Sequence, residues 1–150
     1  MKRSTLLFPI LLALVALQLH AATPAQEKAF VDTYRKALEA GDAKTLAGFL
    51  LTDGATADAV EFFKMTQALD PGAKVVSIEL VKPDAADTAK YGAPIKMPDG
   101  KDYKLPVKAT NVLVIKTETK DANGSSSATA KSPVGEKGGK LMVLIPVPVK

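Results

Sequence analysis

The hydrophobic positions along the chain follow three successive patterns. Residues 6–19 are an apolar run that only Pro9 and Gln18 interrupt. From Phe30 to Leu38 the apolar residues recur at helical spacing, as on one face of a helix. After Gly72 apolar and polar residues alternate, which is typical of strands with one buried face. The pattern therefore predicts an apolar leader, then helices, then a sheet.

The first helix is predicted to begin at Thr23 and to end at Gly41. Thr23 can cap the helix, Pro24 suits the first helical position, and Gln26 completes a capping box. Gly41 ends the helix because glycine tolerates a left-handed backbone at the C-terminal cap.

Two shorter helices are expected next. Asp42 can cap the second helix at once, and Thr56 or Asp58 can open the third. The turn residues Asp70-Pro71-Gly72 end the third helix. The short apolar face of the second helix is expected to consist of Leu46, Phe49 and Leu50.

The rest of the chain predicts strands joined by turns. The strands are expected at residues 76–80, 95–97, 103–105, 107–119 and 141–147. Turn residues at 98–101 and 121–124 predict two hairpins, and Asn123-Gly124 is the strongest of these signals. Residues 83–94 and 132–139 are expected to be loops, and residues 125–131 a weakly paired strand.

Helices that precede an antiparallel sheet indicate an α+β fold. Residues 23–150 are expected to form one domain, with the N-terminal helices packed on a strongly curved antiparallel sheet. Pro146 and Pro148 lack a backbone N–H, so the end of the last strand is expected at a sheet edge.

The N-terminal segment resembles an export signal. Met1-Lys2-Arg3 is cationic, the apolar run has about 14 residues, and the small residues Ala21-Ala22 follow it. A run of this length is shorter than the roughly 20 residues that span a hydrocarbon core. We therefore expect residues 1–22 to be a signal peptide that is cut after Ala21 or Ala22. The alternative is an uncleaved membrane anchor.

The composition bears on where the protein is located and which partners it can bind. Cleavage would leave a periplasmic or secreted protein without a stable membrane anchor, and the absence of cysteine removes both a lipid anchor and disulfides. Removal of Lys2, Arg3 and His20 with the leader would lower the formal net charge from +4 to +2. Lysines are scattered rather than gathered in a stripe, so nucleic acid is not an expected partner.

Several catalytic classes are excluded for a chain that has lost His20. Without histidine or cysteine it cannot build Ser-His-Asp or Cys-His nucleophile systems, nor the usual zinc, haem or iron–sulfur sites. The chain also carries no phosphate-binding glycine motif. No cofactor and no metal are therefore expected.

One stretch resembles a known family. Residues 30–42, followed by Leu46 and Phe49-Leu50, resemble the opening of the nuclear-transport-factor-two-like superfamily, with its amphipathic helix, Gly-Asp break and second helix. Residues 139–143 look like the final strand of its exported bacterial branches, with Leu141 in place of an aromatic residue. The resemblance implies a cone formed by helices and a bent antiparallel sheet.

The same resemblance suggests one enzymatic alternative. Tyr34 falls where steroid isomerases of this superfamily carry a tyrosine that donates a hydrogen bond to a developing oxyanion. Such an isomerase or cyclase also needs a carboxylate base, for which Asp32 and Asp58 are the candidates. The position that matches the family's base is Ala59, next to Asp58, so the motif breaks there.

The leading hypothesis is an exported, non-enzymatic domain that binds a small apolar ligand or a protein partner in the cell envelope. The residues expected to line its cone are Phe30, Tyr34, Phe49, Phe63, Leu113 and Ile115; the alternative is that they are ordinary core residues. Residues 141–149 are apolar and expected at an edge, which keeps homodimerisation by strand pairing open. The alternative to homodimerisation is that one face of residues 141–149 packs in the core, while Pro146 and Pro148 block pairing at the edge.

Overall fold

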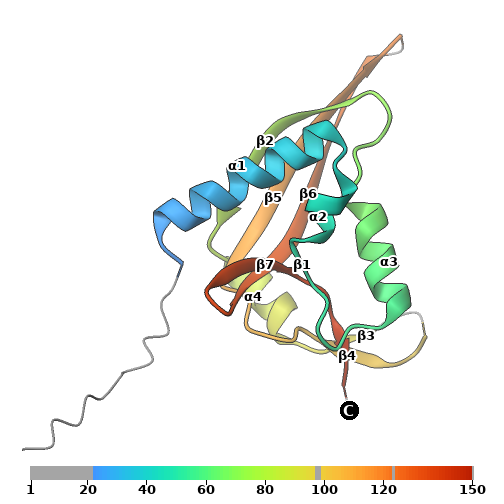
Figure 1. The fold of residues 1–150 in the computed structure, drawn as a ribbon. Helices are drawn as coiled ribbons and strands as arrows, with labels where there is room; N and C mark the ends of the chain where they lie inside the picture. Colours follow the sequence, from blue (N-terminus) through green and yellow to red (C-terminus); the bar gives the residue numbers. More distant parts are fainter. Residues whose placement is uncertain (1–21, 97–98, 123, 150) are drawn as a thin grey trace, which may run out of the picture.

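A computed structural model describes residues 22–96, 99–122 and 124–149. The helices of this part are α1 (Pro24–Ala40), α2 (Ala43–Ala47), α3 (Ala57–Thr66) and α4 (Ala85–Gly92). The strands are β1 (Leu50–Leu51), β2 (Ala73–Val81), β3 (Ile95–Lys96), β4 (Asp102–Lys104), β5 (Asn111–Asp121), β6 (Gly124–Lys137), β7 (Lys140–Leu144) and β8 (Val147–Pro148). The fold is therefore α+β, and Figure 1 shows α1 lying across one face of a curved, open sheet.

The predicted boundaries of α1 are confirmed. The Thr23 hydroxyl accepts a hydrogen bond from the Gln26 backbone N–H at 3.3 Å, and the Gln26 side chain accepts one from the Thr23 N–H at 2.8 Å. Gly41 takes the left-handed backbone at the other end, with φ of 63°. Local capping chemistry thus sets the length of α1.

The second helix is shorter than predicted. Asp42 caps α2 as expected, but the helix ends at Ala47, so Phe49 and Leu50 are not on its face. Leu50 and Leu51 instead form β1, which pairs in parallel with β7. Both leucines are buried, and this packing outweighs the helical spacing of Leu50.

The third helix begins after Thr56 rather than Asp58. The Thr56 hydroxyl accepts a hydrogen bond from the Ala59 N–H at 3.3 Å. Asp58 then lies in the first turn, where a carboxylate interacts favourably with the helix dipole.

Five strands form the main sheet in the order β1-β7-β6-β5-β2. All neighbours in it are antiparallel except β1 and β7. The prediction of one purely antiparallel sheet was therefore wrong in two respects, because β1 pairs in parallel with β7 and because β3, β4 and β8 form a sheet of their own. A separate small sheet has the order β3-β4-β8. Its strands β3 and β4 are antiparallel, which confirms the predicted hairpin around residues 98–101. Residues 97 and 98 lie outside the described residues.

The β5–β6 hairpin is longer than predicted. Asp121 pairs with Gly124, so the turn falls where the Asn-Gly signal places it, although Asn123 lies outside the described residues. β6 then pairs with β5 from Gly124 to Val134 and continues to Lys137. The predicted pairing of residues 125–131 with the preceding strand is confirmed. The prediction of a loop at 132–139 was wrong for residues 132–137, because β5 and β7 supply strand partners that the local composition does not reveal.

The loop predicted at residues 83–94 contains α4. The Asp84 side chain caps it by accepting a hydrogen bond from the Asp87 N–H at 2.7 Å. Asp87 packs α4 against the sheet, because its carboxylate forms an ion pair with Lys131 of β6.

The predicted last strand divides into two. β7 lies inside the main sheet between β1 and β6, so Leu141–Leu144 are not at an edge. β8, which contains Pro148, is an edge strand of the small sheet, as expected for a strand that includes proline.

The core lies between α1 and the inner face of the main sheet. It combines one face of α1 with apolar side chains of β2, β5, β6 and β7. Its buried members include Phe30, Tyr34, Leu38, Ile78, Leu113, Val134 and Val143. Within the described ranges, no helix is both long and apolar enough to cross a membrane.

Candidate functional site

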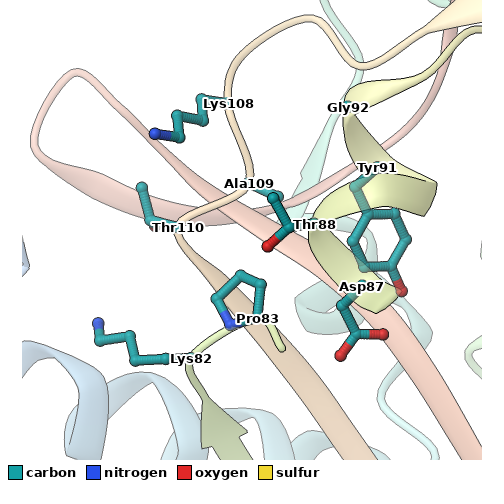
Figure 2. A pocket seen from close by; sticks show the side chains of 9 residues that line it. All are labelled: Lys82, Pro83, Asp87, Thr88, Tyr91, Gly92, Lys108, Ala109 and Thr110. Atoms are coloured by element: carbon teal, nitrogen blue, oxygen red, sulfur yellow. The ribbon is translucent and has the colours of Figure 1, made fainter. Parts of the chain in front are cut away.

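The largest of the main clefts lies between α4 and the segment that leads into β5. It has a volume of about 670 Å³. Figure 2 shows Lys82 and Lys108 on one side of it, with Asp87 and Tyr91 of α4 on the other. The lining residues are Lys82, Pro83, Asp87, Thr88, Tyr91, Gly92, Lys108, Ala109 and Thr110.

The helical spacing of α4 brings its polar side chains to the cleft. Asp87 and Tyr91 are four residues apart, so they lie on the same face of the helix, with Thr88 beside them. The Asp84 cap fixes where the helix begins and therefore which residues face the cleft. The opposite wall is the extended segment 108–110, which enters β5.

Asp87 is a buried carboxylate with a fixed partner. Asp87 is 6% exposed. Both of its carboxylate oxygens accept hydrogen bonds from the Lys131 ammonium, at 3.2 and 3.1 Å. Asp84 lies 3.9 Å from the same ammonium. The hydrogen bond to Asp87 raises the pKa of Lys131, so this ion pair holds α4 on β6 at neutral pH.

The hydroxyl group of Tyr91 is buried. No described residue forms a hydrogen bond with it. Burial raises the pKa of Tyr91, and the negative charge of Asp87 raises it further. The phenol therefore stays protonated and can donate a hydrogen bond.

Lys82 links the rim of the cleft to the body of the protein. Its ammonium lies 3.0 Å from the Glu27 carboxylate of α1. The same Glu27 oxygen accepts a hydrogen bond from the Asn111 side chain at 3.0 Å, and Asn111 is 1% exposed. The hydrogen bonds from Lys82 and then Asn111 lower the pKa of Glu27.

The six residues predicted to line a ligand cavity lie together, in the core. The rings of Phe30, Tyr34 and Phe49 pack with centroids 5.0 to 6.0 Å apart. Leu113 is fully buried, and Phe63 and Ile115 pack against the same cluster. None of the six lines the cleft beside α4.

Three of the six border other clefts. Phe30 and Phe49 line one of about 300 Å³ beside the β6–β7 turn. Phe63 lines the two grooves that flank α3. Tyr34, Leu113 and Ile115 line none of the five main clefts in the described part of the chain.

The residues of the enzymatic alternative lie apart. The Tyr34 hydroxyl accepts a hydrogen bond from the Gln67 side chain at 3.3 Å, and burial raises the pKa of Tyr34. Asp32 is on the exposed face of α1, paired with Lys28. Asp58 lines the groove between α3 and β4, together with Tyr103. No main cleft of the described residues joins Tyr34 to either carboxylate.

Asp87, Thr88 and Tyr91 were not predicted as cleft residues. The segment between Pro83 and Pro94 is rich in alanine and aspartate, and this composition predicts a loop rather than a helix. A usable signal was present, since Asp84 can cap a helix that places Asp87 and Tyr91 on one face.

The described residues contain no cluster of three or more histidine, cysteine, aspartate or glutamate side chains that could hold a metal ion. No protein-family model, curated protein or solved structure matches this chain.

Proposed function

We propose that this chain is an exported binding domain that holds a small molecule with an apolar body and one acidic group in the cleft beside α4. The observation that carries the proposal is the cleft itself. Its volume of about 670 Å³ lies within the roughly 300–1,000 Å³ that is usual for small-molecule sites. Its wall combines a few polar groups with apolar surface, as such sites do.

Lys108, Lys82, Tyr91 and Asp87 each have a role in this proposal. Lys108 and Lys82 at the rim bind the acidic group of the ligand. The Tyr91 ring forms part of the wall that contacts the apolar body, while its hydroxyl stays buried. Pro83 and Ala109 contact the apolar body. Asp87 orients α4 through its ion pair with Lys131.

The compartment and the fold family belong to the same proposal. Residues 1–22 direct the chain out of the cytoplasm and are then removed, which places the cleft in the periplasm or outside the cell. Helices packed on one face of a curved sheet support a nuclear-transport-factor-two-like, cone-shaped domain. In this proposal the aromatic cluster around Phe30 and Tyr34 stabilises the fold, and the ligand binds elsewhere. The isomerase or cyclase alternative gains no support from the positions of Tyr34, Asp32 and Asp58.

Binding can be tested with anilinonaphthalene sulfonate, a fluorescent probe with an apolar body and one acidic group. Thr88→Trp places a large ring in the cleft and is expected to weaken binding of the probe by about tenfold, or about 1.4 kcal/mol. Lys108→Glu is expected to weaken it as well, because a cation at the rim becomes an anion.

Thr33→Trp is the matched control, since Thr33 is an exposed residue on α1 and not part of the cleft. The urea unfolding midpoint of each variant shows whether the fold has loosened, because this probe also binds loosened folds. Equal affinity of wild type and Thr88→Trp for the probe would contradict the proposed site.

A further inference from the structure

Along most of its length, one edge of β6 has no partner among the described strands. β5 pairs with one side of β6 from Gly124 to Val134, whereas β7 pairs with the other side only from Val134 to Lys137. No described strand covers that second side between Gly124 and Ser132. Every residue from 124 to 131 is exposed.

The register of the hairpin indicates which backbone groups point outward. Asp121 lies opposite Gly124 across a two-residue turn. The two residues that flank such a turn form a hydrogen-bonded pair. Bonded and non-bonded pairs alternate along antiparallel strands. Ser126, Ala128 and Ala130 therefore bond to β5, and the N–H and C=O groups of Ser125, Ser127 and Thr129 point to the open edge.

The open edge of β6 differs from the edge at the other end of the described sheet, which is β2. Natural sheet edges are protected by charges, bulges or proline. β2 carries a bulge between Val75 and Ser77, and its Lys74 and Glu79 are exposed. Residues 124–130 of β6 are Gly, Ser, Ser, Ser, Ala, Thr and Ala, with no charge and no proline. The β6 edge therefore lacks these protections.

We infer that a second copy of this chain pairs with residues 124–130 of β6, antiparallel and about a two-fold axis near Ser127. Self-pairing places small, uncharged side chains of the two copies opposite one another, so neither bulk nor like charge opposes contact. A two-fold interface also satisfies both open edges at once and closes the assembly.

The shape of the protein permits this pairing. Figure 1 shows the tip of the β5–β6 hairpin projecting beyond the helices. Antiparallel pairing makes the two hairpins point in opposite directions, so the two bodies lie at opposite ends of the overlap. An overlap of seven residues extends for about 24 Å at about 3.4 Å per residue. The two main sheets then become one continuous sheet.

A charge-swap experiment on the protein recovered from the envelope fraction tests this interface. Native mass spectrometry and sedimentation equilibrium are expected to show two copies for the wild type. Ser127→Lys and Ser127→Glu should each be monomeric, because each places like charges opposite one another at the two-fold axis. An equimolar mixture of the two variants should restore pairing, with one copy of each.

Val76→Lys on the β2 edge is the control and should remain paired like the wild type. Circular dichroism of each variant tests whether loss of pairing reflects unfolding. Restored pairing in the mixture tests the same point independently, because unfolded chains would not pair. A monomeric wild type, a dimer insensitive to both charges, or open-ended polymers would each overturn the inference. So would a different protein bound at this edge in place of the second copy.

Discussion

At the scale of single residues, Glu27 joins three elements that are distant in the sequence. Its carboxylate on α1 accepts hydrogen bonds from Lys82, just after β2, and from Asn111 at the start of β5. No local pattern predicts such contacts, because the partners lie 55 and 84 residues away. The capping residues Thr23, Gly41 and Asp42 were predictable because each acts within a few positions of itself.

Removal of Glu27 should therefore destabilise the protein. Glu27→Ala leaves the buried Asn111 amide without its acceptor, which is expected to lower the free energy of unfolding by about 1–3 kcal/mol. Glu27→Gln should cost less, because its amide oxygen can still accept from Asn111. Urea unfolding followed by circular dichroism measures both.

The matched control is Glu39→Ala, which removes an exposed pair with Arg35 on the same helix and should cost about 0.5 kcal/mol or less. The effect of Glu27 should also depend on pH. Because its pKa in the folded protein is lowered from the ordinary 4.5, its contribution is present above pH 4.5 and is lost as the pH falls through the folded pKa. A stability difference between wild type and Glu27→Gln that grew on acidification would contradict this account.

At the scale of elements, the sequence predicted the helices and strands that depend on local signals. It missed the strands that form only because another strand, distant in the sequence, pairs with them. The periodicity of α1 and the alternation of β2 gave correct types for both. β1 was missed because Leu50 continues the helical spacing of Leu46, and only pairing with β7, far along the chain, makes Leu50 and Leu51 a strand. The N-terminal half of β6 is rich in serine and alanine, which have little preference for strands; pairing with β5 determines its structure.

Gly135 on β6 shows how closely two elements approach near the candidate site. A Cβ atom at this position would lie 2.8 Å from the Lys108 carbonyl oxygen and 3.0 Å from a methyl group of Val107. The backbone oxygen can move away only if the segment that forms a wall of the cleft also moves. Gly135→Ala is therefore expected to destabilise the fold by about 1–3 kcal/mol.

Thermal unfolding measures this effect, with Gly92→Ala as the control. Gly92 ends α4, and a Cβ atom there would meet nothing within 4 Å. The control should leave the unfolding midpoint unchanged or raise it slightly, because alanine favours helix. If Gly135→Ala were as stable as Gly92→Ala, the close approach of β6 to residues 107–108 would not constrain the fold.

At the scale of the whole molecule, the sequence predicted the α+β class but placed the ligand cavity in the core. Phe30 and Tyr34 share one face of α1, and Leu113 belongs to one face of β5; a shared face describes a packed interior as well as a cavity. The cleft beside α4 depends on how α4 and residues 108–110 lie relative to one another, which the spacing of residues within one segment does not reveal. A site formed by facing segments becomes visible only in three dimensions.

The N-terminal segment leads to a further prediction for the whole molecule, namely export followed by cleavage. Residues 1–21 lie outside the described residues, whereas Ala22 packs against the core and Thr23 caps α1. Cleavage after Ala21 or Ala22 would therefore leave the cap of the first helix in the product. Intact mass measurement of protein from the envelope fraction should show a chain that lacks the first 21 or 22 residues.

The double variant Ala21→Arg, Ala22→Arg removes the small residues that the cut requires and should leave full-length precursor in the membrane fraction. Lys74→Arg in β2, far from the cut, serves as the control and should be processed like the wild type. Wild-type chains of full length in the cytosol would contradict both the signal peptide and the proposed location of the binding cleft.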